Sequence, residues 1–220
     1  MNRRSVTVVI AILAMVFLAL VVANAAVDQR RVDELLKSIT SYDFGDSREP
    51  LTELTEILQT AYGSPDELRE IEKKFITFLK SDATFAGKQY ICQRLSIFGT
   101  EESVPVLAQM LKSAKEADIA RYALERIPGD KVDAALQKAV SQVSGNVQLG
   151  IINTIGMRKK PSGVPVLLKL LPADDRAVGE AIMAALGNIG DETAAAALEK
   201  HATNLKCGVR QIAMDAYLKC

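Results

Sequence analysis

The sequence lacks tryptophan and has one histidine, three cysteines and few aromatic residues, which make up 5% of its 220 residues. With so few aromatic side chains, stacking platforms for sugars or single-stranded nucleic acids are scarce. One histidine disfavours both a histidine-based metal site and a Ser-His-Asp triad. The charges balance at 27 basic and 27 acidic residues, so no overall field favours nucleic acid. We therefore expect no catalytic residues, no cofactor, no metal and no nucleic-acid partner.

The histidine and the cysteines do not suggest a ligand set either. His201 has no cysteine or carboxylate at ligand spacing within its predicted helix. Cys207 and Cys220 share one predicted helix, where a rise of about 1.5 Å per residue places them roughly 20 Å apart, too far for a disulfide. Cys92 is expected in a mixed, partly exposed position. Cys220 either pairs with another chain in an oxidising compartment or stays a thiol without function.

The first residues have the layout of a secretory signal peptide. Two arginines precede an uncharged, almost wholly apolar run over residues 6–22, and "ANA" at residues 23–25 offers a cleavage site after Ala25. The run is also close to the length that spans a bilayer, so an uncleaved anchor over residues 6–27 is the alternative. Both interpretations predict export, to the periplasm or the cell exterior, and the second adds attachment to the membrane.

Residues 26–82 are predicted to form a small helical region. A turn-rich segment, "YDFGDSREP" at residues 42–50, separates its first helix from its second. The sequence "GSPDE" begins the third helix, with Ser64 as N-cap and Pro65 at the first helical position. Glu67 stands where it would complete a capping box with Ser64.

The remainder of the chain, residues 83–220, repeats itself. Five ten-residue frames carry large apolar residues in the first, sixth and ninth columns, and the first four have Gly or Pro in the tenth. The frames are YICQRLSIFG (90–99), IARYALERIP (119–128), VQLGIINTIG (147–156), VGEAIMAALG (178–187) and VRQIAMDAYL (209–218). This spacing predicts one apolar stripe on a helix, which the Gly or Pro then ends.

A second helix is predicted after each of the first four frames. The four segments share apolar residues at helical spacing and cover residues 104–111, 132–139, 164–171 and 194–201. The unit is therefore a helix, a short turn and a helix in about 30 residues. Because each unit leaves apolar surface on both sides, neighbouring units must stack to bury it. The sequence predicts an all-α fold, an α-solenoid.

The stretch "AALGNIGDET", residues 184–193, illustrates the repeated turn. Two glycines and an acid beside a helix are compatible with a phosphate-binding loop. The same column, however, holds Gly or Pro in four successive frames, which favours a turn between helices. In this interpretation Gly187 ends one helix and Asp191 is the N-cap of the next.

The repeated frames resemble the short HEAT repeats of many bacterial proteins, including the phycobilisome-lyase-like group, with "AALGNIGDETAAAALEK" (184–200) as the best single match. The segment at residues 42–51 is similar to the leader region of exported bacterial HEAT-repeat proteins. The resemblance implies a right-handed superhelix whose second helices line the concave side, and a scaffold that binds a protein of unknown identity. It carries over no catalytic residues. The alternatives are a lyase-type protein that handles a chromophore or other ligand, and the N-terminal interaction module of a larger exported assembly.

The candidate binding positions are exposed residues of the predicted second helices: Gln109, Lys112, Gln137, Lys169 and Lys200. The basic turn "MRKKPS" at residues 157–162 is expected to be a solvated loop. The last frame, residues 209–218, has no second helix after it. It either caps the stack or leaves an apolar end for self-association, through this helix or through Cys220.

Overall fold

The computed structural model describes residues 27–171, 175–202 and 215–218, and every regular element within these ranges is helical. The elements are α2 (Gln29–Ile39), α3 (Glu49–Ala61), α4 (Pro65–Leu79), α5 (Phe85–Phe98), α6 (Val104–Met110), α7 (Ala117–Arg126), α8 (Asp130–Val140), α9 (Gly145–Arg158), η1 (Pro161–Gly163), α10 (Val164–Lys169), α11 (Arg176–Ile189) and α12 (Glu192–Ala202). None of these described helices is long and apolar enough to cross a membrane. The predicted signal peptide or anchor lies outside the described residues, as do Cys207, Cys220 and the His201 side chain.

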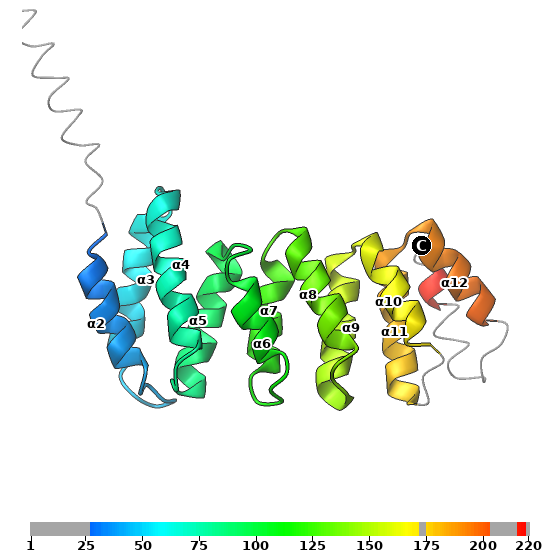
Figure 1. The fold of residues 1–220 in the computed structure, drawn as a ribbon, viewed down its shortest axis with the longest axis horizontal. Helices are drawn as coiled ribbons and strands as arrows, with labels where there is room; N and C mark the ends of the chain where they lie inside the picture. The colour runs from blue at the N-terminus through cyan, green and yellow to red at the C-terminus, as the bar shows by residue number, and fades with distance from the viewer. Residues whose placement is uncertain (1–26, 172–174, 203–214, 219–220) are drawn as a thin grey trace, which may run out of the picture.

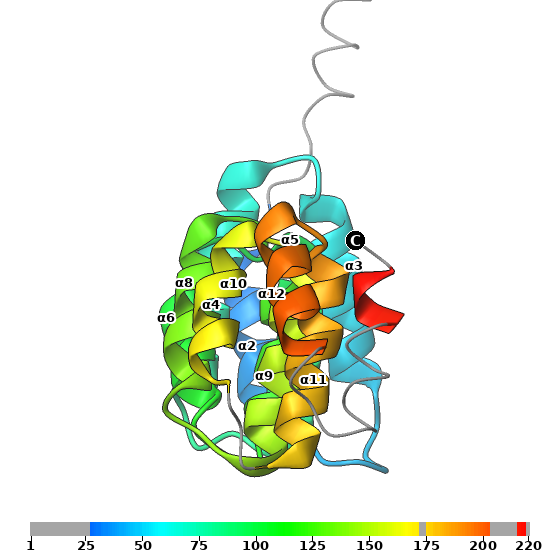
Figure 2. The same ribbon diagram turned by 90° about the vertical axis from the view of Figure 1, so that its right-hand side faces the viewer.

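The helices stack into two layers along the long axis of the molecule (Figure 1). The first-helix layer consists of α3, α5, α7, α9 and α11, and in it α5 packs on α7, α7 on α9 and α9 on α11. The second-helix layer consists of α4, α6, α8, α10 and α12, with contacts between α6 and α8 and between α10 and α12. Figure 2 looks along the stack and shows α6, α8 and α10 on one side and α9 and α11 on the other. The predicted all-α solenoid is confirmed.

The core lies between the two layers, where the repeated apolar columns predicted it. The sixth-column residues of the first four frames are fully buried, and they are Leu95, Leu124, Ile152 and Met183. The second helices contribute Leu107, Leu136, Leu167 and Leu198, all with 0% exposure. Burial of a leucine-sized side chain contributes about 1.5–3 kcal/mol, so packing against neighbouring units supplies much of the stability of each unit.

The tenth-column glycines do not all end their helices, which corrects the sequence prediction. Gly99 is the C-cap of α5, as predicted. Gly156 and Gly187, in contrast, lie within the last turns of α9 and α11. These helices end in left-handed caps at Lys159 (φ 53°) and Gly190 (φ 67°). Glycine adopts this conformation without strain, which explains Gly190 but not Gly187.

Gly156 and Gly187 are needed for close helix packing. A Cβ atom on Gly156 would lie 2.7 Å from Cα of Ala185, on the neighbouring helix α11. A Cβ atom on Gly187 would lie 2.7 Å from Cβ of Ala216, in the helical turn at residues 215–217. Each glycine therefore faces an alanine of the next unit, and the two backbones approach closely at that point.

In the stretch "AALGNIGDET", Gly187 therefore packs against the next unit, Gly190 caps the end of α11, and Asp191 is the N-cap of α12. Oδ1 of Asp191 accepts a hydrogen bond from the backbone N–H of Ala194 at 2.8 Å, which confirms the predicted cap. The contact of Gly187 with Ala216 also places the C-terminal turn on α11, as expected if the last helix caps the stack. Self-association through this end stays a prediction.

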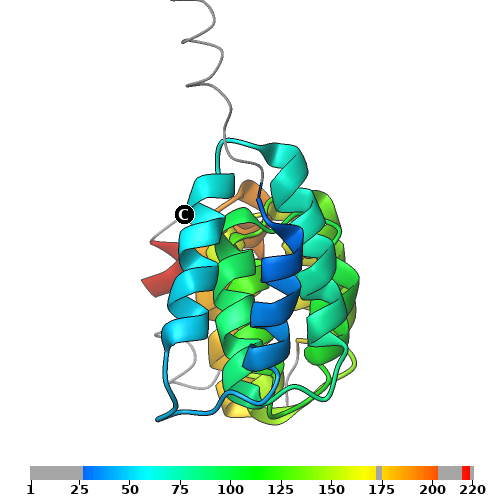
Figure 3. The same cartoon turned by 90° about the vertical axis from the view of Figure 1, so that its left-hand side faces the viewer.

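At the N-terminal end, α2 packs against both α3 and α4 (Figure 3). Pro65 begins α4 as predicted, but the capping box does not form, because Ser64 makes no side-chain capping bond. Oε1 of Glu67 instead accepts the backbone N–H of Val27 at 3.0 Å. Glu67 therefore fixes the start of the described chain to α4.

Candidate interaction surface

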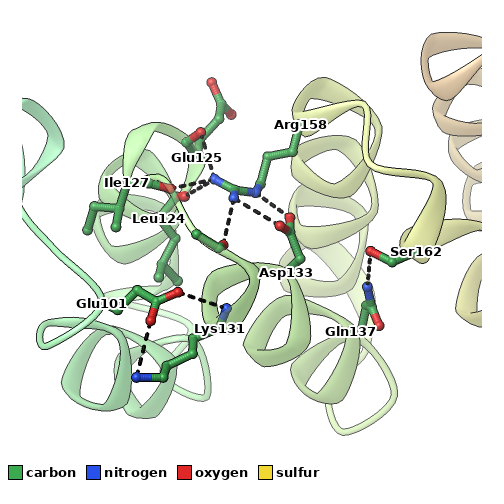
Figure 4. Close-up of polar contacts among 10 residues, drawn as sticks. Glu101, Leu124, Glu125, Ile127, Lys131, Asp133, Gln137, Arg158 and Ser162 are labelled. Carbon is green, nitrogen blue, oxygen red and sulfur yellow. Dashed lines mark hydrogen bonds and ion pairs between the residues drawn. The ribbon is translucent and has the colours of Figure 1, made fainter.

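The five predicted binding residues all belong to the second-helix layer. Gln109, Lys112, Lys169 and Lys200 are exposed, whereas Gln137 is half-buried. Nε2 of Gln137 donates to Oγ of Ser162 at 3.1 Å, so this side chain links α8 to the turn before α10 (Figure 4). The structure therefore leaves four of the five side chains on the surface and gives Gln137 a structural contact.

Two adjoining hollows lie around Gln109 and Lys112. One, of about 200 Å³, lies between α6 and α8 and is also lined by Ala108, Ala135 and Lys138. The other, of about 470 Å³, lies between the end of α4 and α6, and Gln109 and Lys112 line both. We call the two hollows together the lysine groove. The structure does not bring Gln137, Lys169 or Lys200 into it.

The second hollow has an apolar floor and a basic rim. Val106 and Met110 of α6 are 6% and 5% exposed and form part of the floor. Lys80, the residue after α4, stands on the rim with Lys112. Glu116 also lines this hollow, and its Oε1 is bound by Nζ of Lys88 at 2.9 Å. The arrangement suits a ligand with apolar and anionic groups.

Sequence reasoning missed Lys80 and Lys138, although a signal for them was present. A lysine stands close to the C-terminal end of every second helix, and these residues are Lys80, Lys112, Lys138, Lys169 and Lys200. A cation at this end of a helix interacts favourably with the helix dipole. Because the helix dipole alone explains a lysine at this position, the sequence pattern by itself does not predict binding. It supports a binding site only for the lysines that line the groove.

A buried ion pair holds the groove helix α8 to the following unit. Nε of Arg158 lies 2.5 Å from Oδ1 of Asp133, and the two side chains are 6% and 8% exposed. The same guanidinium donates to the carbonyl oxygens of Leu124 (2.9 Å) and Ile127 (2.7 Å) at the end of α7 (Figure 4). The expectation of a solvated "MRKKPS" loop is therefore wrong for Arg158, whose charge is paired and hydrogen-bonded inside the fold.

Two carboxylates make similar links near α6. Glu72 of α4 is buried and accepts hydrogen bonds from the backbone N–H of Thr100 at 2.7 Å and from Oγ of Ser103 at 2.6 Å. Glu101 accepts from the side chain of Lys131, which lies 3.1 Å away, and from its backbone N–H. These hydrogen bonds hold the pKa of Glu101 below its usual value. Together the contacts fix the turn before α6 to α4 and to α8.

Cys92 is buried, which corrects the expected partly exposed position. It lies on α5 with 0% exposure, and burial raises its pKa to about 12. Its thiol therefore stays protonated at neutral pH and is a poor nucleophile and metal ligand. Within the described ranges, no group of three or more His, Cys, Asp or Glu residues is placed to hold a metal ion.

One comparison with known proteins supports the repeat architecture directly. Residues 132–217 match the family model of HEAT repeats. Among solved structures, human deoxyhypusine hydroxylase in complex with glycerol matches with 15% sequence identity and a TM-score of 0.43. That match covers 86% of this chain and 96% of the hydroxylase chain. No curated protein matches this chain. The family match places HEAT repeats over residues 132–217, and the stacked helical pairs of the described chain have the same helix–turn–helix architecture.

Proposed function

We propose that this chain is a non-enzymatic scaffold that binds another protein through its second-helix layer. The observation that carries the proposal is the lysine groove, a hollowed, partly apolar surface that includes Gln109 and Lys112. The links through Glu72, Glu101 and Asp133 support it, because they hold the groove helices in place before a partner arrives. A surface held in its binding conformation loses less entropy on association.

Export from the cytoplasm is part of the same proposal. Its support is the signal-peptide layout of residues 1–25, followed by a cleavage site after Ala25. N-terminal sequencing of the protein from the exporting cell distinguishes a cleaved signal peptide from an uncleaved membrane anchor. A start at Ala26 supports cleavage, and an intact N-terminus in the membrane fraction supports anchoring over residues 6–27.

Site-specific photocrosslinking tests the binding proposal. A photoreactive amino acid replaces Gln109 in the groove or, as the matched control, Asn153, an exposed residue of α9 in the first-helix layer. In cells that make the full chain, we expect one discrete adduct from position 109 and none from position 153. Adducts of equal yield from both positions, or from position 153 alone, would contradict binding through the second-helix layer.

A further inference from the structure

We propose that the lysine groove binds an extended, acidic segment of the partner protein. This inference rests on the proposed function and adds the chemistry of the ligand. The segment crosses the C-terminal ends of α4, α6 and α8, with carboxylates toward the lysines and apolar side chains toward the groove floor.

The charge of the groove is not neutralised from within the protein. Lys80, Lys112 and Lys138 are exposed on its rim, and none of them forms an ion pair in the described part of the chain. Among the described residues, Glu116 is the only carboxylate that lines the groove, and Lys88 binds it. Anionic groups of a partner are therefore the complement that the rim lacks.

The hollow at the N-terminal end differs from the groove, because most of its lysines are paired with carboxylates of the protein. It lies between α2 and α4, measures about 400 Å³ and is lined by Lys37, Lys73 and Lys74. Nζ of Lys73 lies 2.7 Å from Glu70, and Lys74 pairs with Asp33. Most of the positive charge in that hollow is already matched, so it has less attraction for an acidic ligand.

The dimensions favour an extended segment over a helix. Packed helices lie about 8–10 Å apart, so a path across α4, α6 and α8 is roughly 20 Å long. An extended chain covers this distance with about six residues, at roughly 3.3 Å per residue. A helix rises only about 1.5 Å per residue and presents side chains on all sides, so it would need about 13 residues to cover the same path. In an extended chain, successive side chains alternate in direction, as the basic rim and apolar floor require.

Peptide binding to the full chain tests the inference. The probes are three fluorescein-labelled eight-residue peptides in which leucine alternates with glutamate, glutamine or lysine, followed by fluorescence anisotropy. We expect the glutamate peptide to bind at least tenfold more tightly than the glutamine peptide, and the lysine peptide not to bind. The affinity for the glutamate peptide should fall as salt rises, because salt screens exposed charges.

Charge reversal locates the site. The double variant Lys112→Glu/Lys138→Glu should weaken binding of the glutamate peptide at least tenfold. Lys160→Glu is the matched control, since Lys160 is exposed, lies in the turn before α10 and is outside the groove. We expect Lys160→Glu to change the affinity less than twofold. Equal effects of the two variants, or equal binding of the glutamate and glutamine peptides, would overturn the inference.

Two further experiments distinguish an acidic protein segment from other ligands and from a different binding site. Vesicles of phosphatidylserine test a membrane surface as the ligand. Vesicle binding that Lys112→Glu/Lys138→Glu abolishes, without competition by the glutamate peptide, would overturn the inference. Crosslinking of the natural partner from position 109 is repeated in the double variant. If the crosslink persists in the double variant, the acidic-segment inference is overturned but the proposed function is not. If the peptide binds but no crosslink forms at position 109, the proposed function alone is contradicted.

Discussion

The helices α9 and α11 of the first-helix layer and the helices α4, α6 and α8 of the second-helix layer are packed in different ways. In the first-helix layer, glycine and alanine bring α9 and α11 so close that no side chain fits between Gly156 and Ala185. In the second-helix layer, α4, α6 and α8 are separated by hollows of about 470 and 200 Å³. A hollow of about 260 Å³ also lies between α5 and α7 of the first-helix layer, so the contrast holds for these helices and not for the whole layers. We expect α9 and α11 to hold neighbouring units together and α4, α6 and α8 to carry the binding surface.

Removal of Arg158 should have the largest effect on stability, because Arg158 connects the two layers. The variant Arg158→Met leaves the Asp133 carboxylate buried without its cation. We expect the free energy of unfolding, measured by urea denaturation, to fall by about 3–5 kcal/mol. The control is Arg176→Met, which breaks an exposed ion pair with Glu180 and should change the free energy of unfolding far less, because solvent screens that pair. Similar losses in both variants would show that the Arg158 link contributes no more than a surface pair.

A methyl group in the first-helix layer should have the next largest effect. Gly156→Ala places a Cβ atom 2.7 Å from the α11 backbone, and we expect it to destabilise the fold by about 1–3 kcal/mol, although alanine favours helix. Gly150→Ala is the matched control on the same helix, because its Cβ meets only the flexible side chain of Arg121. Thermal unfolding of both variants measures the loss of stability that each added methyl group causes. If Gly156→Ala is as stable as Gly150→Ala, close packing is not what requires glycine at position 156.

Charge reversal in the second-helix layer should have the smallest effect on stability. Lys112→Glu/Lys138→Glu alters two exposed side chains near helix ends, so the free energy of unfolding should change by about 1 kcal/mol or less for each substitution. Urea denaturation measures this change, and peptide anisotropy measures the loss of binding on the same preparation. A stability loss as large as that of Arg158→Met would mean that the lysines belong to the structural framework and not to a binding surface.

The repeat pattern was sufficient to predict the fold, because the core needs only apolar residues at helical spacing in each unit. The capping role of Asp191 was also predictable, since an N-cap depends on residues close in sequence. The role of Gly187 was not, because a glycine near a helix end has the same local pattern whether it ends the helix or packs against a neighbour. Alanine at positions 185 and 216, in the same column of successive frames, is the signal that distinguishes the two.

The binding surface was only partly predictable. Gln109 and Lys112 followed from their exposure on a predicted second helix, and both line the groove. The contact of Arg158 with Asp133 joins residues 25 positions apart, so no local pattern indicated that one basic residue of "MRKKPS" is buried. The position of Lys138 in the groove could not be predicted, because it depends on which faces of α6 and α8 lie beside each other.

Hydrogen–deuterium exchange of the full chain, with and without the crosslinked partner or the glutamate peptide, is the most direct test of whether the second-helix layer carries the binding surface. We expect slower exchange on binding in α6, in α8 and at the end of α4, with little change in α7, α9 and α11. Slower exchange confined to the first-helix layer, with α6 and α8 unchanged, would contradict the account.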